Sequence, residues 1–297
     1  MMILDASDFF SFDLTPYMPF IENEIMWFDV FYTQQQQSRD AYGLSGTYGN
    51  ETLVLYPATA CETYKGAYNP ASTVSGLRAV VSRILQVNPS YTIGNTSYYE
   101  GLLKRIPKTP LRYQQGRQTI APAETWARIQ NTEIPQLYPV FPWHEYGVGL
   151  PNLSYAMNTY LYDSDTQAFH GYQGWKQDAI WMADMGLTDM ARNITTLKLQ
   201  DSNAHRFPTF WGPGFDWTPE MDMGGTGMIA LQEMLMQTYG NASRTIRLLP
   251  AWPIEWTADF KLRAPFNTTV EGRVERGKLV RLAVEPLERR GDVVIGA

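Results

Sequence analysis

The sequence predicts a mainly α fold, part of a helical toroid, followed by a small C-terminal β-sandwich-like domain. Two observations lead to this prediction. Apolar residues recur at helical spacing through most of the chain, and several of these segments are apolar on more than one side, which is typical of helices buried between others. After Gly240 the pattern changes to short runs of β-branched residues, which indicates strands. We therefore expect a helical region over residues 1–240 and a β domain over residues 241–297.

The helical region begins with an apolar pattern over residues 18–32, which ends in a run of glutamines. A short extended segment is expected at residues 51–56. Ser72 is the predicted N-cap of a second helix, because its hydroxyl can accept a hydrogen bond from a first-turn amide. Repeated prolines predict a loop-rich region over residues 91–142. Further helices are expected near residues 152–162, 175–185, 188–199 and 225–238.

The β domain is expected to follow a linker at residues 239–243. Its predicted strands are residues 245–249, 259–264, 269–274, 279–284 and 293–295. Glu275-Arg276-Gly277 has the composition of a hairpin turn. Arg290-Gly291-Asp292 is also predicted to be a hairpin turn rather than an adhesion motif.

The composition narrows the classes of partner. The 297 residues carry a net charge of −6, and Lys and Arg are scattered along the chain. Proteins that bind nucleic acid or an anionic membrane use a concentrated basic surface, so neither partner is expected. The three histidines lack the spacing that would place two of them on one metal, and the glycine-rich residues 224–227 lack a phosphate-loop lysine. No metal or other cofactor is expected.

Glycosylation sequons predict the compartment. Random placement would put Ser or Thr at the required spacing after about one asparagine in eight, whereas half of the asparagines of this chain have one. The sequons begin at Asn50, Asn95, Asn152, Asn193, Asn241 and Asn267. We therefore expect a secreted glycoprotein.

The N-terminal residues do not form a signal peptide, because residues 1–10 carry Asp5 and Asp8 and lack a basic region. No apolar run approaches the ~18 residues that a membrane helix needs. To reconcile these features with secretion, we expect this chain to be the C-terminal part of a longer protein, with an upstream half-barrel as its partner.

A carbohydrate site is predicted from residues 212–227, where three carboxylates lie among aromatic residues and glycines. Aromatic rings offer flat apolar faces to sugar C–H groups, glycines let the backbone approach a ligand, and a carboxylate can serve as general acid or base. The expected ligand is an oligosaccharide or glycan. The expected stacking residues are Trp143, Trp211 and Trp217, and the expected partners of sugar hydroxyls are Glu133, His144 and Asp216.

Glu62 and Asp222 are the predicted catalytic carboxylates. Each follows apolar or small residues, a setting in which desolvation can raise the pKa of a carboxyl group. The neighbouring Cys61 is the only cysteine, and we expect it to be a buried small apolar residue rather than a nucleophile.

Two motifs carry a family resemblance. Ala60-Cys61-Glu62 follows a Leu-Val segment and a proline, and Met221-Asp222-Met223-Gly224-Gly225 precedes Glu233-Met234-Leu235-Met236-Gln237. In these places the sequence resembles glycoside hydrolase family 95, the α-L-fucosidase family with an (α/α)6 barrel. The resemblance gives Glu62 the role of general acid and matches Asp222 to the catalytic aspartate of the family. Supporting matches, in a resemblance that runs from about Gly46 onward, are Gly174-Trp175, Leu137-Tyr138-Pro139 and Leu248-Leu249-Pro250-Ala251-Trp252-Pro253.

The resemblance implies inverting hydrolysis of a terminal fucose- or galactose-like sugar, with Glu62 protonating the leaving oxygen and Asp222 helping to polarise a water. Two departures keep other functions open. Residues 131–136 stand in place of the paired histidines of the family, and no Asn-x-Asn pair is present to hold the attacking water. The alternatives are an inactive carbohydrate-binding remnant, a truncated fragment, and a polysaccharide lyase.

Overall fold

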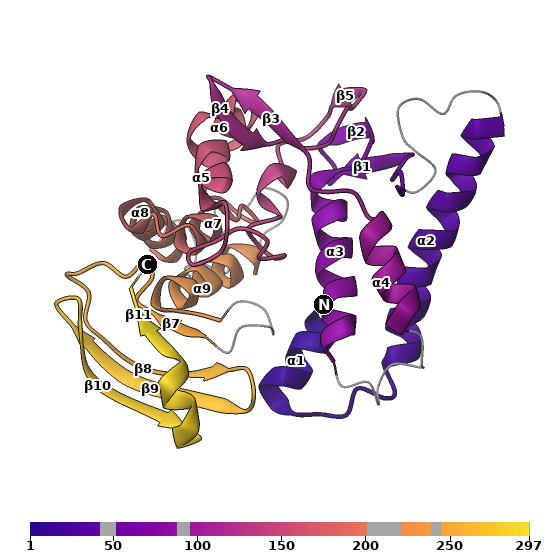
Figure 1. Cartoon of the computed structure of the whole chain (residues 1–297). Coiled ribbons are helices and arrows are strands. Elements are labelled where there is room, and N and C mark those ends of the chain that lie inside the picture. Colours follow the sequence, from indigo (N-terminus) through magenta and orange to yellow (C-terminus); the bar gives the residue numbers. More distant parts are fainter. Residues whose placement is uncertain (42–51, 88–95, 201–220, 239–244, 297) are drawn as a thin grey trace. The chain divides into compact units, whose positions relative to one another are not determined.

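The computed structural model describes residues 1–41, 52–87, 96–200, 221–238 and 245–296. They form two compact units, the first made of residues 1–145 and 158–166 and the second of residues 146–157 and 167–297. Both units combine helices with small sheets, so the architecture is mixed α/β rather than mainly α (Figure 1). Within the described ranges neither unit closes into a helical barrel. The predicted boundary at residue 240 lies outside those ranges.

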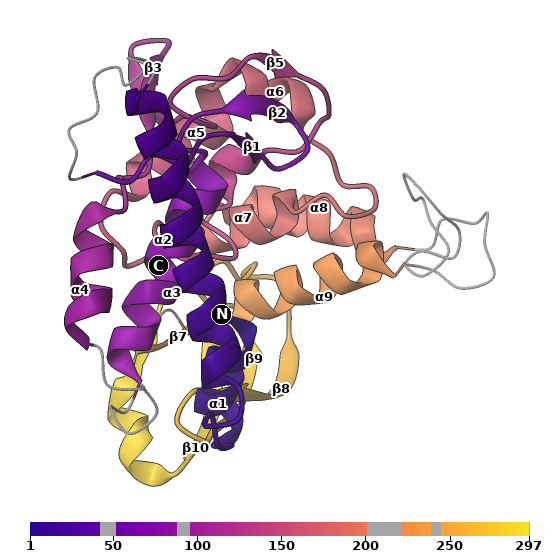
Figure 2. The same ribbon diagram turned by 90° about the vertical axis from the view of Figure 1, so that its right-hand side faces the viewer.

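The first unit is built on helices that share one apolar core. These helices are α1 (Met2–Phe10), α2 (Met18–Ala41), α3 (Ala71–Gln86) and α4 (Thr96–Arg105). α2, α3 and α4 run side by side in two perpendicular views (Figures 1 and 2). Ile21, Val74 and Leu102 contribute one buried side chain each from these helices to the core. The helix predicted at residues 18–32 is thus confirmed, although it continues through the glutamines to Ala41.

Two features of these helices differ from the predictions. α1 and α4 were not expected, and α4 occupies part of the region predicted to be loops. Pro70, not Ser72, is the N-cap of α3, and no side chain caps this helix end. A proline fits there because the helix start needs no N–H from it.

Short strands complete the first unit. β1 (Ala58–Ala60), β2 (Tyr64–Ala67) and β5 (Arg128–Ile129) form an antiparallel sheet in the order β1-β2-β5, and β3 (Leu111–Gln114) pairs with β4 (Arg117–Ile120) in a hairpin. Residues 53–55, predicted to be extended, are buried but belong to no strand. The 3-10 helix η1 (Pro135–Leu137) follows β5.

The helices of the second unit match the predictions closely. α7 (Asp178–Asp184), α8 (Thr188–Leu199) and α9 (Asp222–Leu235) pack on one another, and α8 has the predicted bounds. A Cβ on Gly227 would lie 2.7 Å from Leu199 Cδ2, so the glycine lets α9 approach α8 closely. The chain passes from the first unit to the second after Glu145, returns within α5 (Leu153–Tyr162), and passes to the second again within α6 (Ser164–Phe169).

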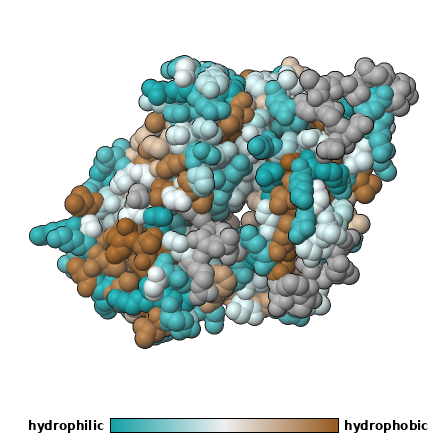
Figure 3. Space-filling view, viewed as in Figure 1, coloured by the Kyte–Doolittle hydropathy of each residue, from teal (hydrophilic) through white to brown (hydrophobic). Residues whose placement is uncertain are grey.

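All the predicted C-terminal strands are confirmed. They are β7 (Ile246–Leu248), β8 (Ala258–Ala264), β9 (Thr268–Glu275), β10 (Lys278–Glu285) and β11 (Val293–Ile295). β8, β9 and β10 form an antiparallel meander, while β7 lies between β11 and β6 (Met236–Gln237). On the face shown in Figure 3, hydrophobic residues are interspersed with hydrophilic ones where these strands lie.

The two predicted turns of this region have different outcomes. Arg276 and Gly277 have φ values of 48° and 71° between the paired residues Glu275 and Lys278, which gives the predicted hairpin a type I′ turn. The prediction of a hairpin turn at Arg290-Gly291-Asp292 is wrong, because these residues end the 3-10 helix η2 (Leu287–Asp292). Burial of Arg289 favours the helix, since its guanidinium donates to Thr268 Oγ1 at 2.9 Å.

Candidate functional site

Glu62 lies in the tight turn between β1 and β2. Cys61 adopts a left-handed conformation with φ 49°, and the chain reverses there. Asn131 donates from Nδ2 to Glu62 Oε2 at 3.2 Å, and the Glu62 carboxyl group is exposed. The expectation of an apolar setting is therefore wrong. The buried residues that precede Glu62 face the core, but the turn at Cys61 carries the carboxyl group to the surface.

Glu133 fixes this turn. Its Oε2 accepts hydrogen bonds from the Glu62 backbone N–H at 2.5 Å and from Thr63 Oγ1 at 3.2 Å. In return, Thr63 Oγ1 accepts from the Glu133 N–H at 2.9 Å. Thr63 is fully buried. One oxygen of Glu133 thus positions the backbone of the predicted acid, a contact that the prediction of a sugar-binding role did not include.

A pocket of about 420 Å³ opens beside the turn, and we call it the Trp143 pocket. It lies between α2, β1, α3 and the segment after η1, and its walls are mainly apolar. Its lining includes Phe28, Cys61, Ser72, Gly76, Tyr138 and Trp143. Cys61 lines the pocket and Glu62 follows it directly, so the backbone of the predicted acid lies next to an aromatic pocket, although the Glu62 side chain is not among the lining residues.

Two polar side chains of the pocket lining contact Cys61. The Cys61 thiol is hydrogen-bonded to the side chains of Tyr138 and Ser72. Burial, with a smaller effect of the Glu133 carboxylate, raises the pKa of the thiol to about 12. Burial likewise raises the pKa of the Tyr138 hydroxyl above its usual value. Cys61 is therefore a protonated thiol at neutral pH, in keeping with the prediction that it is not a nucleophile.

Trp143 packs against α3 where that helix has a glycine. A Cβ on Gly76 would lie 2.8 Å from Trp143 Cε2 and Cζ2, closer than two carbons can approach. The indole Nε1 is buried and has no hydrogen-bond partner among the described residues. Packing rather than a polar contact therefore holds this ring, which lines the pocket as a stacking residue would.

His144 follows Trp143 with φ 49° and lies edge-on to Phe141, with 5.9 Å between ring centroids. Its Nδ1 is buried, and burial lowers the pKa of the imidazole to about 4. His144 is neutral at pH 7, so it could exchange hydrogen bonds with a sugar hydroxyl but carries no charge.

Asp222 occupies the first turn of α9 in the second unit and is exposed. Met223, the next residue, is 1% exposed, because the helix turns it inward and leaves Asp222 outward. The apolar setting expected for Asp222 is wrong for this reason. Glu62 and Asp222 belong to different compact units, so the separation of about 6.5–9.5 Å that inverting hydrolysis requires of two carboxyl groups stays a prediction for this pair. Trp211, Asp216 and Trp217 lie outside the described residues.

The second unit contains two titratable features that sequence reasoning missed. Burial raises the pKa of Glu233, on α9, to about 8. The apolar residues that follow it directly, Met234, Leu235 and Met236, were the available signal. His170 Nδ1 lies 2.9 Å from Oδ1 of the buried Asp178, which also accepts from the Gly171 N–H at 3.3 Å. His170 and Asp178 are eight residues apart across a loop, so the sequence did not indicate that they interact.

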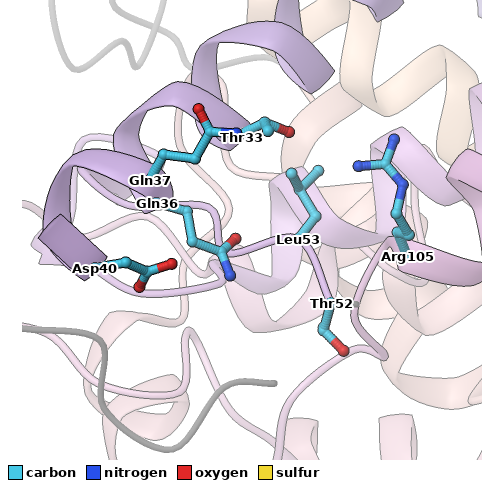
Figure 4. A pocket seen from close by; sticks show the side chains of 7 residues that line it. All are labelled: Thr33, Gln36, Gln37, Asp40, Thr52, Leu53 and Arg105. Atoms are coloured by element: carbon cyan, nitrogen blue, oxygen red, sulfur yellow. The ribbon is translucent and has the colours of Figure 1, made fainter. Parts of the chain in front are cut away.

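A second, more polar pocket of about 290 Å³ lies elsewhere in the first unit. In Figure 4, Thr33, Gln36, Gln37 and Asp40 project from α2 toward Leu53, Thr52 and Arg105. Arg105 is paired with Asp29 at 2.6 Å. The glutamine run thus supplies pocket walls, but none of the predicted site residues lines this pocket.

Comparison with known proteins yields no match, either to a family model or to a curated protein. Among the helices of the described ranges, none is long and apolar enough to cross a membrane.

Proposed function

We propose that the chain is a glycoside hydrolase of the family 95 type that removes a terminal fucose- or galactose-like sugar from an oligosaccharide. The observation that carries the proposal is the exposed Glu62, which accepts a hydrogen bond from Asn131 and directly follows Cys61 in the wall of a pocket lined by Tyr138 and Trp143. A carboxyl group near aromatic rings is a combination suited to sugar cleavage, because the rings can contact apolar parts of a glycoside while the acid reaches the glycosidic oxygen.

In this mechanism Glu62 donates a proton to the leaving oxygen. The Glu133 contact holds the Glu62 backbone in place, and the Asn131 amide orients the carboxyl group. Asp222 helps to polarise a water on the opposite face of the sugar, which requires about 6.5–9.5 Å between the two carboxyl groups. Inversion at the anomeric carbon follows from this arrangement.

The toroidal fold and secretion belong to the same proposal. α7 and α8 are consecutive helices joined by residues 185–187, the kind of hairpin from which an (α/α)6 toroid is assembled. The sequon asparagines Asn152, Asn193 and Asn267 are all exposed, which glycosylation requires.

One observation favours a carbohydrate-binding protein without activity as the second candidate. The Asn131 amide donates to Glu62 Oε2, and an amide beside a carboxyl group is a pair of polar groups that can bind sugar hydroxyls without any chemical step. A lyase has less support, because burial raises the pKa of Tyr138, the tyrosine of the pocket, whereas a lyase base needs a lowered pKa.

Sugar release from fucosyl and galactosyl oligosaccharides, followed by ¹H NMR, tests the proposal. We expect the anomer formed first to be inverted, and we expect Glu62→Gln and Asp222→Asn to abolish release with little effect on folding, because both side chains are exposed. Saturable binding without release would favour the binding protein, and an unsaturated product absorbing in the ultraviolet would favour a lyase.

A further inference from the structure

The Trp143 pocket is unlike a site for a sugar ring alone. A sugar presents hydroxyl groups on most of its edge, and each hydroxyl buried without a partner is unfavourable. The polar side chains at the Cys61 end, Ser72 and Tyr138, are already hydrogen-bonded to the thiol, and the remaining walls are mainly apolar. The interior of the pocket is therefore better matched to a ligand group without hydroxyls.

The pocket is also the right size for a flat hydrocarbon group. Its volume of about 420 Å³ exceeds the roughly 150 Å³ cavity that accepts benzene in an engineered protein, so a fused two-ring group fits. Phe28 and the indole of Trp143 supply aromatic walls for such a group.

The polar edge lies next to the apolar interior. Cys61 is part of the pocket wall, and consecutive Cα atoms are about 3.8 Å apart, so the Glu62 backbone lies at the rim. The Glu133 and Glu62 carboxylates both raise the pKa of the Cys61 thiol, as expected for charges close to that end of the pocket. A ligand with a sugar at one end and an apolar group at the other would match both regions.

We propose that the Trp143 pocket binds the aromatic aglycone of an aryl glycoside whose sugar lies at the Glu62–Asn131 rim. This inference rests on the proposed function and specifies its substrate class. The apolar pocket then favours aryl glycosides over methyl glycosides with the same sugar, because the aryl group transfers a much larger apolar surface from water.

The experiment compares dissociation constants by isothermal titration calorimetry. The probes are the methyl and 2-naphthyl glycosides of fucose and galactose, and 2-naphthol alone. For the wild-type chain we expect the 2-naphthyl glycoside of the bound sugar to bind at least about tenfold more tightly than its methyl glycoside. Thr73→Phe, which places a ring in the pocket from the first turn of α3, should remove this preference and change the methyl glycoside constant by less than about twofold.

Two variants keep the experiment decisive. Val80→Phe fills the pocket from a different turn of α3 and should act like Thr73→Phe if the latter folds poorly. Thr33→Phe is the matched control, because Thr33 is also a partly buried helical threonine but lines the other pocket. It should keep the preference for the 2-naphthyl glycoside.

The outcomes separate this inference from the proposed function. Equal binding of methyl and 2-naphthyl glycosides by the wild-type chain, or a preference that survives both pocket-filling variants, would overturn the aglycone site while leaving the hydrolase proposal standing. Binding of 2-naphthol that Thr73→Phe abolishes, with no binding of any glycoside, would overturn the sugar rim and the proposed function but would still identify the pocket as a site for aromatic groups.

Discussion

Each compact unit contains a partly buried side chain with a strongly shifted pKa, and the two side chains are of opposite kinds. In the first unit, burial lowers the pKa of His144 to about 4, and in the second, burial raises the pKa of Glu233 to about 8. Both shifts favour the neutral form, because desolvation disfavours charge of either sign. The predicted catalytic carboxylates, Glu62 and Asp222, are exposed instead. The two residues with these shifted pKa values are thus different from those that the motifs indicate. His144 should make stability fall toward acid, and Glu233 should make it fall toward alkali.

Each unit also buries an arginine, and removing one gives the largest expected effect. Arg83 on α3 is 3% exposed, contacts the Asp8 carboxylate and donates to the Leu4 carbonyl at 3.2 Å. Arg83→Met should lower the free energy of unfolding by about 4 kcal/mol, because it leaves a partly buried Asp8 unpaired. In differential scanning calorimetry only the transition of the first unit should shift, whereas Arg289→Met should shift that of the second. Equal shifts of one shared transition would show that the units do not unfold separately.

Glu233 should make the second unit sensitive to alkali. The pKa of Glu233 is raised in the folded state, so the stabilisation that depends on its neutral carboxyl group is fully present below about pH 4.5. It is lost as the pH rises through about 8. Glu233→Gln keeps the shape without ionising, so it should stabilise the protein by about 3 kcal/mol at pH 7. Urea unfolding at pH 5, 7 and 8 measures this effect. Glu100→Gln, an exposed control on α4, should change nothing, and a destabilised Glu233→Gln at pH 8 would contradict the assignment.

His144 should make the first unit sensitive to acid. The pKa of His144 is lowered in the folded state, so the stabilisation that depends on its neutral imidazole is fully present above about pH 6.5. It is lost as the pH falls through about 4. By pH 5 the loss should be about 2 kcal/mol. His144→Asn tolerates the positive φ and does not titrate, so its stability should fall less between pH 7 and 5. Parallel pH profiles for the two proteins would show that the imidazole is not the cause.

Gly76 gives the smallest expected effect and tests the packing of Trp143. Alanine favours a helix over glycine by about 1 kcal/mol, but here its Cβ would overlap the indole. We expect Gly76→Ala to destabilise the first unit by about 1 kcal/mol and to change the tryptophan fluorescence. Gly101→Ala on α4 is the matched control, since no atom lies within 4 Å of its Cβ position, and it should be stabilising. If Gly76→Ala were more stable than the wild-type chain, the indole of Trp143 would have to move aside for the added Cβ, and the packing described for it would be contradicted.

The sequence predicted correctly those helices, strands and turns that depend on interactions between residues close together in the chain. β9 alternates buried and partly buried residues along its length, and the glycine after Arg276 permits the positive φ of a type I′ turn. α8 has a clear helical period and was predicted to the residue. The C-terminal strands could therefore be derived from the sequence.

Tertiary contacts explain what the sequence could not predict. Ser72 was expected to cap α3, but its side chain hydrogen-bonds to Cys61, a partner distant enough in sequence to leave no local signal. Asn131 reaches Glu62 across 69 residues. The left-handed turn at Cys61 is rare for a non-glycine residue, so the sequence favoured a buried Glu62 rather than an exposed one.

The leaving-group dependence of Glu62→Gln tests the central claim most directly, that Glu62 protonates the leaving oxygen. With the sugar that the wild-type chain releases, we expect this variant to cleave the methyl glycoside about 10²- to 10⁴-fold more slowly. Cleavage of the 2,4-dinitrophenyl glycoside should fall by less than about tenfold, because that leaving group departs without a proton, and Glu100→Gln should cleave both at the wild-type rate. Equal rates for Glu62→Gln and the wild-type chain on the methyl glycoside would contradict the assignment.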